Sequence, residues 1–299
     1  MRTDDFRRST NVEDDRQASA SRSPGRAGGV GIGVVVIATL IGWYFGIDPN
    51  TLINGAQLIL GGGSTEQSSS APAVPAGTPN DATGQFVAAI LGDTEDRWTE
   101  IFAAAGKSYP APKLLLFAGS VPTACGFARS AMGPFYCPRD QRVYLDTAFF
   151  ADLQNKFGAC TSSKACEFSE AYVIAHEVGH HVQNVLGLLP RVTQAQQEAS
   201  SQTEANQLQV KVELQADCLA GVWANRAQQK HNFLDPGDVD QALQTASAIG
   251  DDRLQKKMQG YVVPDSFTHG SAEQRKRWFT TGLKTGSVAS CDTFGAEQL

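Results

Sequence analysis

The sequence has no excess of positive charge, and this excludes one broad class of partner. It contains 25 Lys and Arg residues against 31 Asp and Glu residues, which gives a formal net charge of −6. Proteins that bind nucleic acid gather cations on one face or along one helix. This chain has no such basic stripe, so we expect no nucleic-acid partner. Its 299 residues suffice for one sizeable domain with appendages.

Cysteine is scarce, and its distribution is one-sided. Six cysteines are too few for a small disulfide scaffold, and no Cys-x-x-Cys pair is present, which argues against a cysteine zinc site. All six follow the long apolar run, and an even number there favours an oxidising compartment. Proximity in sequence favours the pairs Cys125–Cys137 and Cys160–Cys166 and leaves Cys218 and Cys291, although six cysteines allow 15 connectivities.

One stretch, residues 27–47, lacks charge altogether and reads AGGVGIGVVVIATLIGWYFGI. Such a run is long enough to cross a bilayer as a helix. Arg22 and Arg26 precede it and Asp48 follows it, a charge pattern that predicts a cytoplasmic N-terminus. A cleaved signal peptide is the alternative. Its apolar core is normally about 7–15 residues, which is shorter than this run, but the alanine-rich APAVPA at 71–76 leaves cleavage open.

The composition divides the chain into four segments. Residues 1–26 are polar without apolar periodicity and are predicted to be a disordered cytoplasmic tail. After the predicted transmembrane helix at 27–47, residues 48–80 carry glycine, serine and proline, as flexible linkers do. Residues 81–299 then form the folded domain. We therefore expect a single-pass protein of the cell membrane with an extracytoplasmic domain.

A metal-binding pattern stands at the centre of that domain. Residues 169–187 read SEAYVIAHEVGHHVQNVLG and contain the motif H-E-x-x-H. Residues four apart share one face of a helix, so His176 and His180 can direct their imidazoles at a single ion. Glu177 follows the first of them, where its carboxylate can act as a general base. Ser169 is the predicted N-cap of this helix.

A catalytic zinc site normally takes three protein ligands, and three later glutamates are candidates. Glu198 and Glu204 lie in a stretch rich in Gln, Ser and Ala, which predicts solvated side chains. Glu213 has apolar neighbours on a predicted core helix, where a carboxylate is costly unless it is paired or bound to metal. Asp217, one turn further on, can support a ligating imidazole. Alternatively, Glu213 is a surface residue beside Lys211.

Helices dominate the predicted domain, with few strands. Short apolar runs at 114–117 and 142–146 predict two strands, which can form a small antiparallel or mixed sheet beside the metal helix. A long helical stretch follows at about 193–230, and Asp235-Pro236 is typical of another helix start. Ser271 with Gln274 forms the pattern of a capping box. The expected class is α+β, preceded by one transmembrane helix.

Four blocks of sequence resemble the family known as putative neutral zinc metallopeptidase. They are HEVGHHVQ, ELQADCLAGVWA, AIGDDRLQ and SFTHGSAEQRKRWFTTG, and the resemblance covers roughly residues 81–290. It implies a zincin-like fold with Zn²⁺ on His176, His180 and Glu213, and Glu177 as the catalytic base. The motifs are also similar to those of membrane-embedded peptidases that trim prenylated proteins. Those proteins have several spans, so their substrates are not carried over.

His269 is a further candidate, because it lies just before the predicted helix that Ser271 caps. A histidine placed across the metal from Glu177 can stabilise the oxyanion of a tetrahedral intermediate. A loop histidine without contact to the site is the alternative. Arg275 belongs to a basic run that is usually a solvated helix face, or it can pair with Asp217 or with substrate.

The predicted function is peptide-bond hydrolysis by a membrane-anchored zinc metallopeptidase. Glu177 serves as the general base, His269 is the oxyanion partner, and a protein or peptide is the substrate. Two alternatives remain open. One is a zinc-dependent amidase acting on cell-wall or other non-peptide amides. The other is a non-catalytic, zinc-stabilised interaction protein of the envelope, which would have no need of the base.

Overall fold

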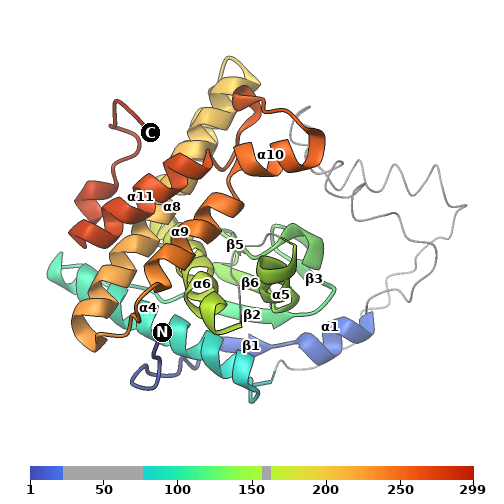
Figure 1. The fold of residues 1–299 in the computed structure, drawn as a ribbon, viewed down its shortest axis with the longest axis vertical. Coiled ribbons are helices and arrows are strands. Elements are labelled where there is room, and N and C mark those ends of the chain that lie inside the picture. The colour runs from blue at the N-terminus through green and yellow to red at the C-terminus, as the bar shows by residue number, and fades with distance from the viewer. Residues whose placement is uncertain (23–76, 157–162) are drawn as a thin grey trace, which may run out of the picture.

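The computed structural model describes residues 1–22, 77–156 and 163–299 of the chain. Helices dominate these residues, and their strands form one four-stranded sheet and one two-stranded hairpin (Figure 1). The predicted α+β class, mostly helical with a small mixed sheet, therefore fits the structure.

The larger sheet has the strand order β1-β2-β6-β5. Its strands are β1 (Val12–Asp14), β2 (Lys113–Phe117), β6 (Arg142–Asp146) and β5 (Phe135–Cys137). The first three are parallel, and β5 runs antiparallel to β6 at the edge. The central strands β2 and β6 are the two that the apolar runs predict. Both faces of this sheet are buried, because Leu114 and Leu116 of β2 pack into the main core while Leu115 packs into a second apolar cluster.

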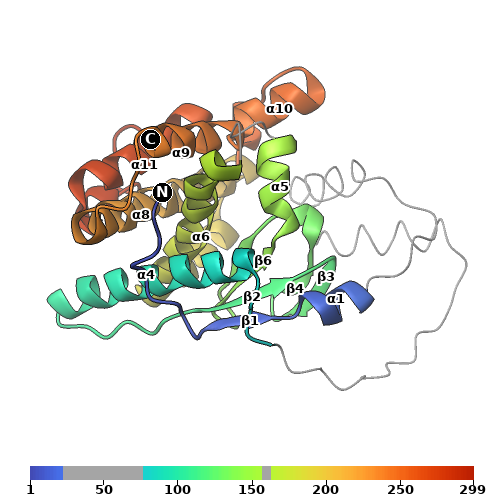
Figure 2. The same ribbon diagram turned by 60° about the horizontal axis from the view of Figure 1, so that its bottom comes forward.

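The helices surround this sheet in layers, and Figure 2 shows α6 and α8 between the sheet and α9–α11. The helices are α1 (Arg16–Arg22), α4 (Ala82–Ala104), α5 (Ala148–Asn155), α6 (Ser163–Val185), α7 (Leu188–Glu198), α8 (Gln202–His231), α9 (Asp238–Ala248), α10 (Asp251–Gln259) and α11 (Ala272–Thr285). Short 3-10 turns are η1 (Ser130–Met132), η2 (Pro264–Ser266) and η3 (Val288–Cys291). The hairpin is β3 (Ser120–Thr123) with β4 (Gly126–Arg129).

Three predicted helix boundaries need correction. Ser169 does not cap the metal helix, because α6 already begins at Ser163 and the buried hydroxyl of Ser169 accepts a hydrogen bond from Thr245. The long helical stretch is two helices, since Ser201 caps α8 with its side chain. The helix expected at Asp235-Pro236 begins instead at Asp238, after a glycine with φ 93°.

One capping prediction is confirmed. The Ser271 side chain accepts a hydrogen bond from the backbone N–H of Gln274, and the Gln274 side chain accepts one from the backbone N–H of Ser271. This capping box fixes the first turn of α11 and the loop that carries His269.

Close helix packing positions the metal helix. A Cβ added at Gly179 would lie 3.0 Å from the backbone oxygen of Ala216, so α6 and α8 touch through their backbones there. Where α8 crosses α11, a Cβ at Gly282 would lie 1.9 Å from the oxygen of Cys218. Glycine at these points brings the faces of α6, α8 and α11 close enough for their polar side chains to meet.

Two disulfides between described residues join separate elements. Cys125–Cys137 links the hairpin to β5, and Cys218–Cys291 links α8 to η3. The first pair was predicted, and the second is the pair that the prediction left over. Cys160, the predicted partner of Cys166, lies outside the described residues.

The N-terminal residues, predicted to be a disordered tail outside the domain, belong to the packed body as far as residue 22. β1 pairs in parallel with β2, and Asp14 exchanges backbone hydrogen bonds with Gly77. Ionic contacts hold the segment, because Arg7 pairs with Glu95 and Asp96 of α4. Charged side chains within residues 1–22 therefore form long-range ion pairs, which no local pattern reveals.

The prediction of a transmembrane helix is corrected as well. In the described part of the chain, no helix is long and apolar enough to cross a membrane. The stretch predicted to span, 27–47, and most of the predicted linker at 48–80 lie outside the described residues. The described residues before and after this stretch are in contact, since Asp14 is hydrogen-bonded to Gly77. A single span between a cytoplasmic N-terminus and an extracytoplasmic domain would separate them, so the predicted single-pass membrane localisation is wrong.

Candidate metal centre

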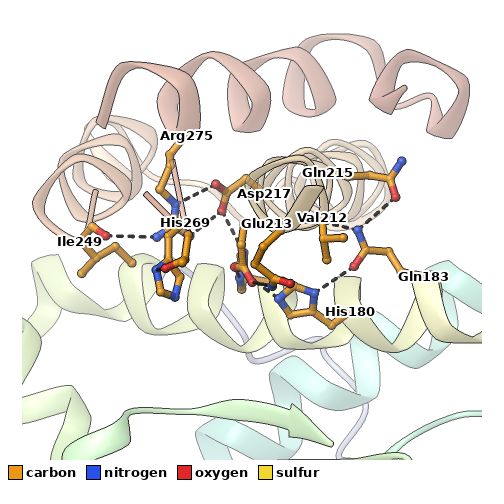
Figure 3. Close-up of polar contacts among 12 residues, drawn as sticks. His180, Gln183, Val212, Glu213, Gln215, Asp217, Ile249, His269 and Arg275 are labelled. Carbon is orange, nitrogen blue, oxygen red and sulfur yellow. Dashed lines mark hydrogen bonds and ion pairs between the residues drawn. The ribbon is translucent and has the colours of Figure 1, made fainter. Parts of the chain in front are cut away.

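Two helices bring two imidazoles and one carboxylate together. One potential ligand atom from each of His176, His180 and Glu213 lies within 4.8 Å of the others. The Oε2 atom of Glu213 is 3.2 Å from Nε2 of His176 and 3.5 Å from Nε2 of His180. Figure 3 shows Glu213 reaching from α8 toward His180 on α6. The four-residue spacing of the histidines places both rings on the face of α6 that meets α8.

Asp217 holds the far side of the His176 ring. Its Oδ1 atom lies 2.8 Å from Nδ1 of His176 and also accepts a hydrogen bond of 2.5 Å from the Tyr172 hydroxyl. With Nδ1 protonated and donating to Asp217, Nε2 of His176 faces Glu213 and, once it has lost its own proton, offers an electron pair to a metal. The structure thus places Asp217 where the sequence predicted a supporting carboxylate.

Arg275 completes this buried network from α11. Its Nε donates to Oδ2 of Asp217 at 2.8 Å and its Nη2 donates to Oδ1 at 2.9 Å, a bidentate pair (Figure 3). Nη2 also donates to the Tyr172 hydroxyl at 3.2 Å. Arg275 is only 3% exposed, so it is not part of a solvated face. Of the two roles left open for it, pairing with Asp217 is the one observed.

Glutamines hold the other two candidate ligands. Nδ1 of His180 donates to Oε1 of Gln183 at 2.9 Å, while Nε2 of Gln183 donates to the backbone oxygen of Val212. Gln209 donates to Oε1 of Glu213 at 2.9 Å and leaves Oε2 facing the two histidines. Neither glutamine is among the site residues predicted from the sequence. Their only signal is spacing, since Gln183 follows His180 by three residues and Gln209 precedes Glu213 by four.

The electrostatics of the cluster favour a bound cation. Three carboxylates, Glu177, Glu213 and Asp217, are buried there with Arg275 as their only permanently positive neighbour among the described residues. Burial lowers the pKa of His176, but the charge and hydrogen bond of Asp217 outweigh this effect and raise it to about 10. Burial opposes ionisation of Glu213 too, yet the charge of His180 brings its pKa well below the usual range. A divalent cation would neutralise the same excess of negative charge.

The donor set also suits zinc in its chemistry. Two imidazole nitrogens and one carboxylate oxygen form one of the three-ligand sets of catalytic zinc, which leaves a fourth position for water or substrate. Each donor is oriented through its second polar atom, by Asp217, Gln183 and Gln209 respectively. The residues present therefore fit Zn²⁺.

Glu177 differs from the other buried carboxylates because it lacks a partner. Within the described residues it makes no hydrogen bond and no ion pair, although it is only 7% exposed. Burial raises the pKa of Glu177. A buried carboxylate with a purely structural role is normally paired, so this group is free to act on a ligand.

His269 lies near the cluster but is anchored elsewhere. Its Nδ1 is 3.2 Å from Oδ1 of Asp251, and Oδ2 of Asp251 accepts backbone N–H bonds from Thr268, His269 and Gly270. Its charge acts on Glu213, whose pKa it helps to lower. Figure 3 shows the ring beside Arg275, above α6. The sequence analysis missed Asp251, because no local pattern links it to a histidine 18 residues later.

The remaining candidates lie away from the cluster. Glu198 and Glu204 are exposed, and Glu204 bonds to Ser200 at the start of α8. His181 points from α6 toward the sheet, where Nδ1 meets the Tyr136 hydroxyl at 3.0 Å and Nε2 meets the Pro110 oxygen at 2.6 Å. This ring therefore fastens α6 to the edge strand β5.

Uncharacterized bacterial proteins are similar to this chain over much or nearly all of its length. The chain is 46% identical over 301 residues to the uncharacterized protein YpfJ of Escherichia coli, and the match covers 99% of both chains. It is 46% identical over 200 residues to an uncharacterized protein of Mycobacterium tuberculosis, covering 64% of this chain and 65% of the relative. No solved structure matches the chain.

The family comparison reaches further along the chain than the four sequence blocks do. The model of the family described as "Putative neutral zinc metallopeptidase" matches residues 1–294. It includes the N-terminal strand as well as both helices of the metal cluster. The chain belongs to the putative neutral zinc metallopeptidase family.

Proposed function

We propose that this protein is a zinc-dependent peptidase with His176, His180 and Glu213 as the metal ligands. The convergence of their three donor atoms within 4.8 Å carries the proposal. The unpaired carboxylate of Glu177 next to them supports it, because a purely structural metal site needs no base. The second partners of all three donors show the kind of support that metal ligands normally receive.

When bound, Zn²⁺ would polarise the scissile carbonyl and lower the pKa of the attacking water toward about 7. Glu177 would remove a proton from that water and later deliver it to the leaving amine. Its burial keeps bulk water away from this transfer. Asp217 would hold His176 in the tautomer that leaves Nε2 free for the metal, and Arg275 would keep Asp217 ionised through its bidentate contact.

His269 would stabilise the oxyanion that develops on the substrate carbonyl. Asp251 accepts a hydrogen bond from Nδ1 of the ring. Burial lowers the pKa of His269, but the contact with Asp251 raises it overall and favours the imidazolium form, whose Nε2–H group can donate toward substrate. The loop is held by the backbone hydrogen bonds to Asp251, so this donor does not have to be ordered during the reaction.

The edge strand β5 supports a peptide as the substrate. It is the last strand of the sheet and pairs on one side only, with β6. Its Tyr136 is joined to α6 through His181, so the free edge of β5 is fixed relative to the metal helix. An extended peptide can add to such an edge through main-chain hydrogen bonds.

The proposed activity is tested with purified full-length protein, zinc and two substrate classes, casein-type proteins and cell-wall material. We expect cleavage of the protein substrate, and Glu177→Gln should lower kcat by about 10²–10⁴-fold, as loss of a general base does. Cleavage of cell-wall amides alone would identify an amidase instead. A Glu177→Gln variant as active as the wild type would overturn the mechanism.

Metal analysis tests the ligand assignment. Glu213→Ala should lose bound zinc, whereas Glu198→Ala and Glu204→Ala should retain it because both side chains are exposed and neither belongs to the cluster of candidate ligands. Zinc retained by the first variant at the wild-type level would refute Glu213 as a ligand.

A further inference from the structure

A basic groove is lined by residues of α9, α10 and α11 and has a volume of about 620 Å³. Figure 2 shows these three helices in the layer farthest from the sheet. The lining of the groove includes Arg253 of α10 and one stripe of α11, namely Glu273, Lys276, Arg277, Thr280 and Lys284. The stripe repeats every three or four residues, so one face of α11 forms the wall of the groove along most of its length.

The groove gathers positive charge on a molecule that is acidic overall. Four of these lining side chains are cations and one is an anion, against a net charge of −6 for the chain. Among the described residues, Lys276 and Lys284 make no ion pair or hydrogen bond, and Arg253 has only a 3.9 Å contact with its neighbour Asp252. By contrast, Arg275 on the inner face of α11 is fully engaged by Asp217.

The spacing of the two free lysines matches an extended peptide. Lys276 and Lys284 are eight residues apart on α11, which corresponds to a rise of roughly 12 Å. In an extended chain, side chains four residues apart point the same way and are separated by roughly 13 Å. Two carboxylates at that spacing can therefore reach both lysines at once, with Arg253 available to a third.

We propose that this groove binds an extended acidic segment of a protein, with Lys276 and Lys284 each contacting one of its carboxylates. The inference rests on the proposed peptidase function in one respect, since it assigns the segment to the protein that is cleaved. Glu273 within the groove disfavours a partner as densely charged as nucleic acid. The groove recruits such substrates while leaving the metal centre unobstructed, because it lies on the opposite face of α11 from Arg275.

Direct binding tests the site without any turnover. The probe is a fluorescent decapeptide of alternating glutamate and serine, measured by anisotropy with full-length protein carrying Glu177→Gln to prevent cleavage. The triple variant Arg253→Gln, Lys276→Gln, Lys284→Gln should bind about tenfold more weakly, since each exposed ion pair contributes roughly two- to threefold. Binding by the unaltered groove should also weaken as salt is raised.

The matched control neutralises two lysines and one arginine elsewhere on the surface, with Lys107→Gln, Lys230→Gln and Arg139→Gln, so both triple variants have the same net charge. Equal weakening in the two triple variants would show a general charge effect and overturn the proposal. Binding of a decapeptide of alternating glutamine and serine as tightly as the acidic probe would also overturn the proposal. Stronger retention of single-stranded DNA than of the peptide would assign the groove to nucleic acid and overturn it too.

Cleavage kinetics then connect the groove with the active site. With Glu177 intact, the groove variant should raise KM for a casein-type substrate bearing an acidic tail while leaving kcat unchanged, and it should not affect the untailed substrate. An unchanged KM for the tailed substrate would refute recruitment. If the protein cleaves neither substrate but the groove variant still loses the acidic probe, the peptidase proposal fails and the binding site stands.

Discussion

At the residue scale, the candidate centre depends on side chains that do not face the metal position themselves. Asp217 accepts hydrogen bonds from Tyr172 and His176 and two from Arg275, all in the interior. Removing one member of such a buried network leaves the other groups unpaired, which is costlier than the loss of one contact. The orientation of His176 therefore depends on α8 and α11 as much as on its own helix.

Asp251→Asn should lower kcat for peptide cleavage by about 10–100-fold with little change in KM, because Asp251 orients the His269 ring. The decisive measurement is a double-mutant cycle. In a His269→Ala background, Asp251→Asn should have no further effect on kcat. Asp252→Asn is the matched control, since Asp252 holds only the Ala272 backbone in this loop. Additive losses in the double variant would show that Asp251 does not act through His269.

The sequence predicts this centre only in part, for a physical reason. His176, Glu177 and His180 are legible because their spacing is local and fixed by helix geometry. Glu213 stands out because a carboxylate among core residues calls for a partner. Gln183, Gln209 and Asp251 are polar residues in polar surroundings along the chain. Their roles arise from which atoms the tertiary fold brings within hydrogen-bond distance, so the sequence alone does not reveal them.

At the element scale, the backbone contact between α8 and α11 is the feature that aligns Arg275 with Asp217. A Cβ at Gly282 would lie 1.9 Å from the Cys218 oxygen, and one at Gly221 would lie 2.2 Å from the Phe279 oxygen. Neither contact can be relieved by turning a side chain, because both involve backbone atoms. The two helices would have to separate.

Gly282→Ala should therefore destabilise the fold by about 2–3 kcal/mol, as overpacking does, measured by denaturant unfolding. Helix propensity alone would give the opposite sign, since alanine is favoured over glycine in a helix by roughly 1 kcal/mol. Thr281→Ala, one residue away and partly exposed, should change stability by less than about 0.5 kcal/mol. A stabilised Gly282→Ala protein would show that the crossing is looser than described.

The two described disulfides should differ in their contribution to stability. Cys218–Cys291 closes a loop of 73 residues and Cys125–Cys137 one of 12. In the chain-entropy model, loops of these sizes correspond to about 4 and about 3 kcal/mol of stabilisation. Replacing each pair with alanine and comparing the unfolding free energies tests this order. A greater loss on removal of the shorter loop would contradict the entropic account.

At the scale of the whole molecule, the N-terminal segment joins elements that are far apart in sequence. β1 forms the edge of the sheet opposite β5, and Arg16 bridges Asp14 and Asp81, the N-cap of α4. Figure 1 shows β1 beside β2 along the lower edge of the sheet. The same residues were predicted to be disordered, because composition reflects local apolar content and carries no information on ion pairs across the fold.

The ion pairs of Arg16 with Asp14 and Asp81 should make the stability of the fold depend on pH. The side-chain hydrogen bond from Arg16 lowers the pKa of Asp81 to about 2, and Arg16 also lowers that of Asp14. A folded-state pKa below the unfolded one stabilises the protein at neutral pH, and the benefit disappears as pH falls from about 5 toward 2. Because Asp81 is half exposed, solvent screening limits the effect to about 0.5–1 kcal/mol.

Arg16→Met should thus cost about 0.5–1 kcal/mol at pH 7 and almost nothing near pH 2, as measured by denaturant unfolding at both values. Arg8→Met is the control, since Arg8 donates only to the backbone oxygens of Thr3 and Phe6 and should show no comparable pH dependence. A loss that is equal at the two pH values would exclude the carboxylates as its cause.

The pairing of β1 with β2 has a consequence for synthesis on the ribosome. Val12 lies opposite Leu114, so β1 is synthesised roughly 100 residues before the strand with which it pairs. At about 5–20 residues per second, that interval is roughly 5–20 s. During this interval, β1 lacks its partner strand, and its backbone N–H and C=O groups can form hydrogen bonds with other chains. The charged residues around β1 keep this segment hydrated until β2 is available. In the folded protein they form the ion pairs that attach the segment to α4.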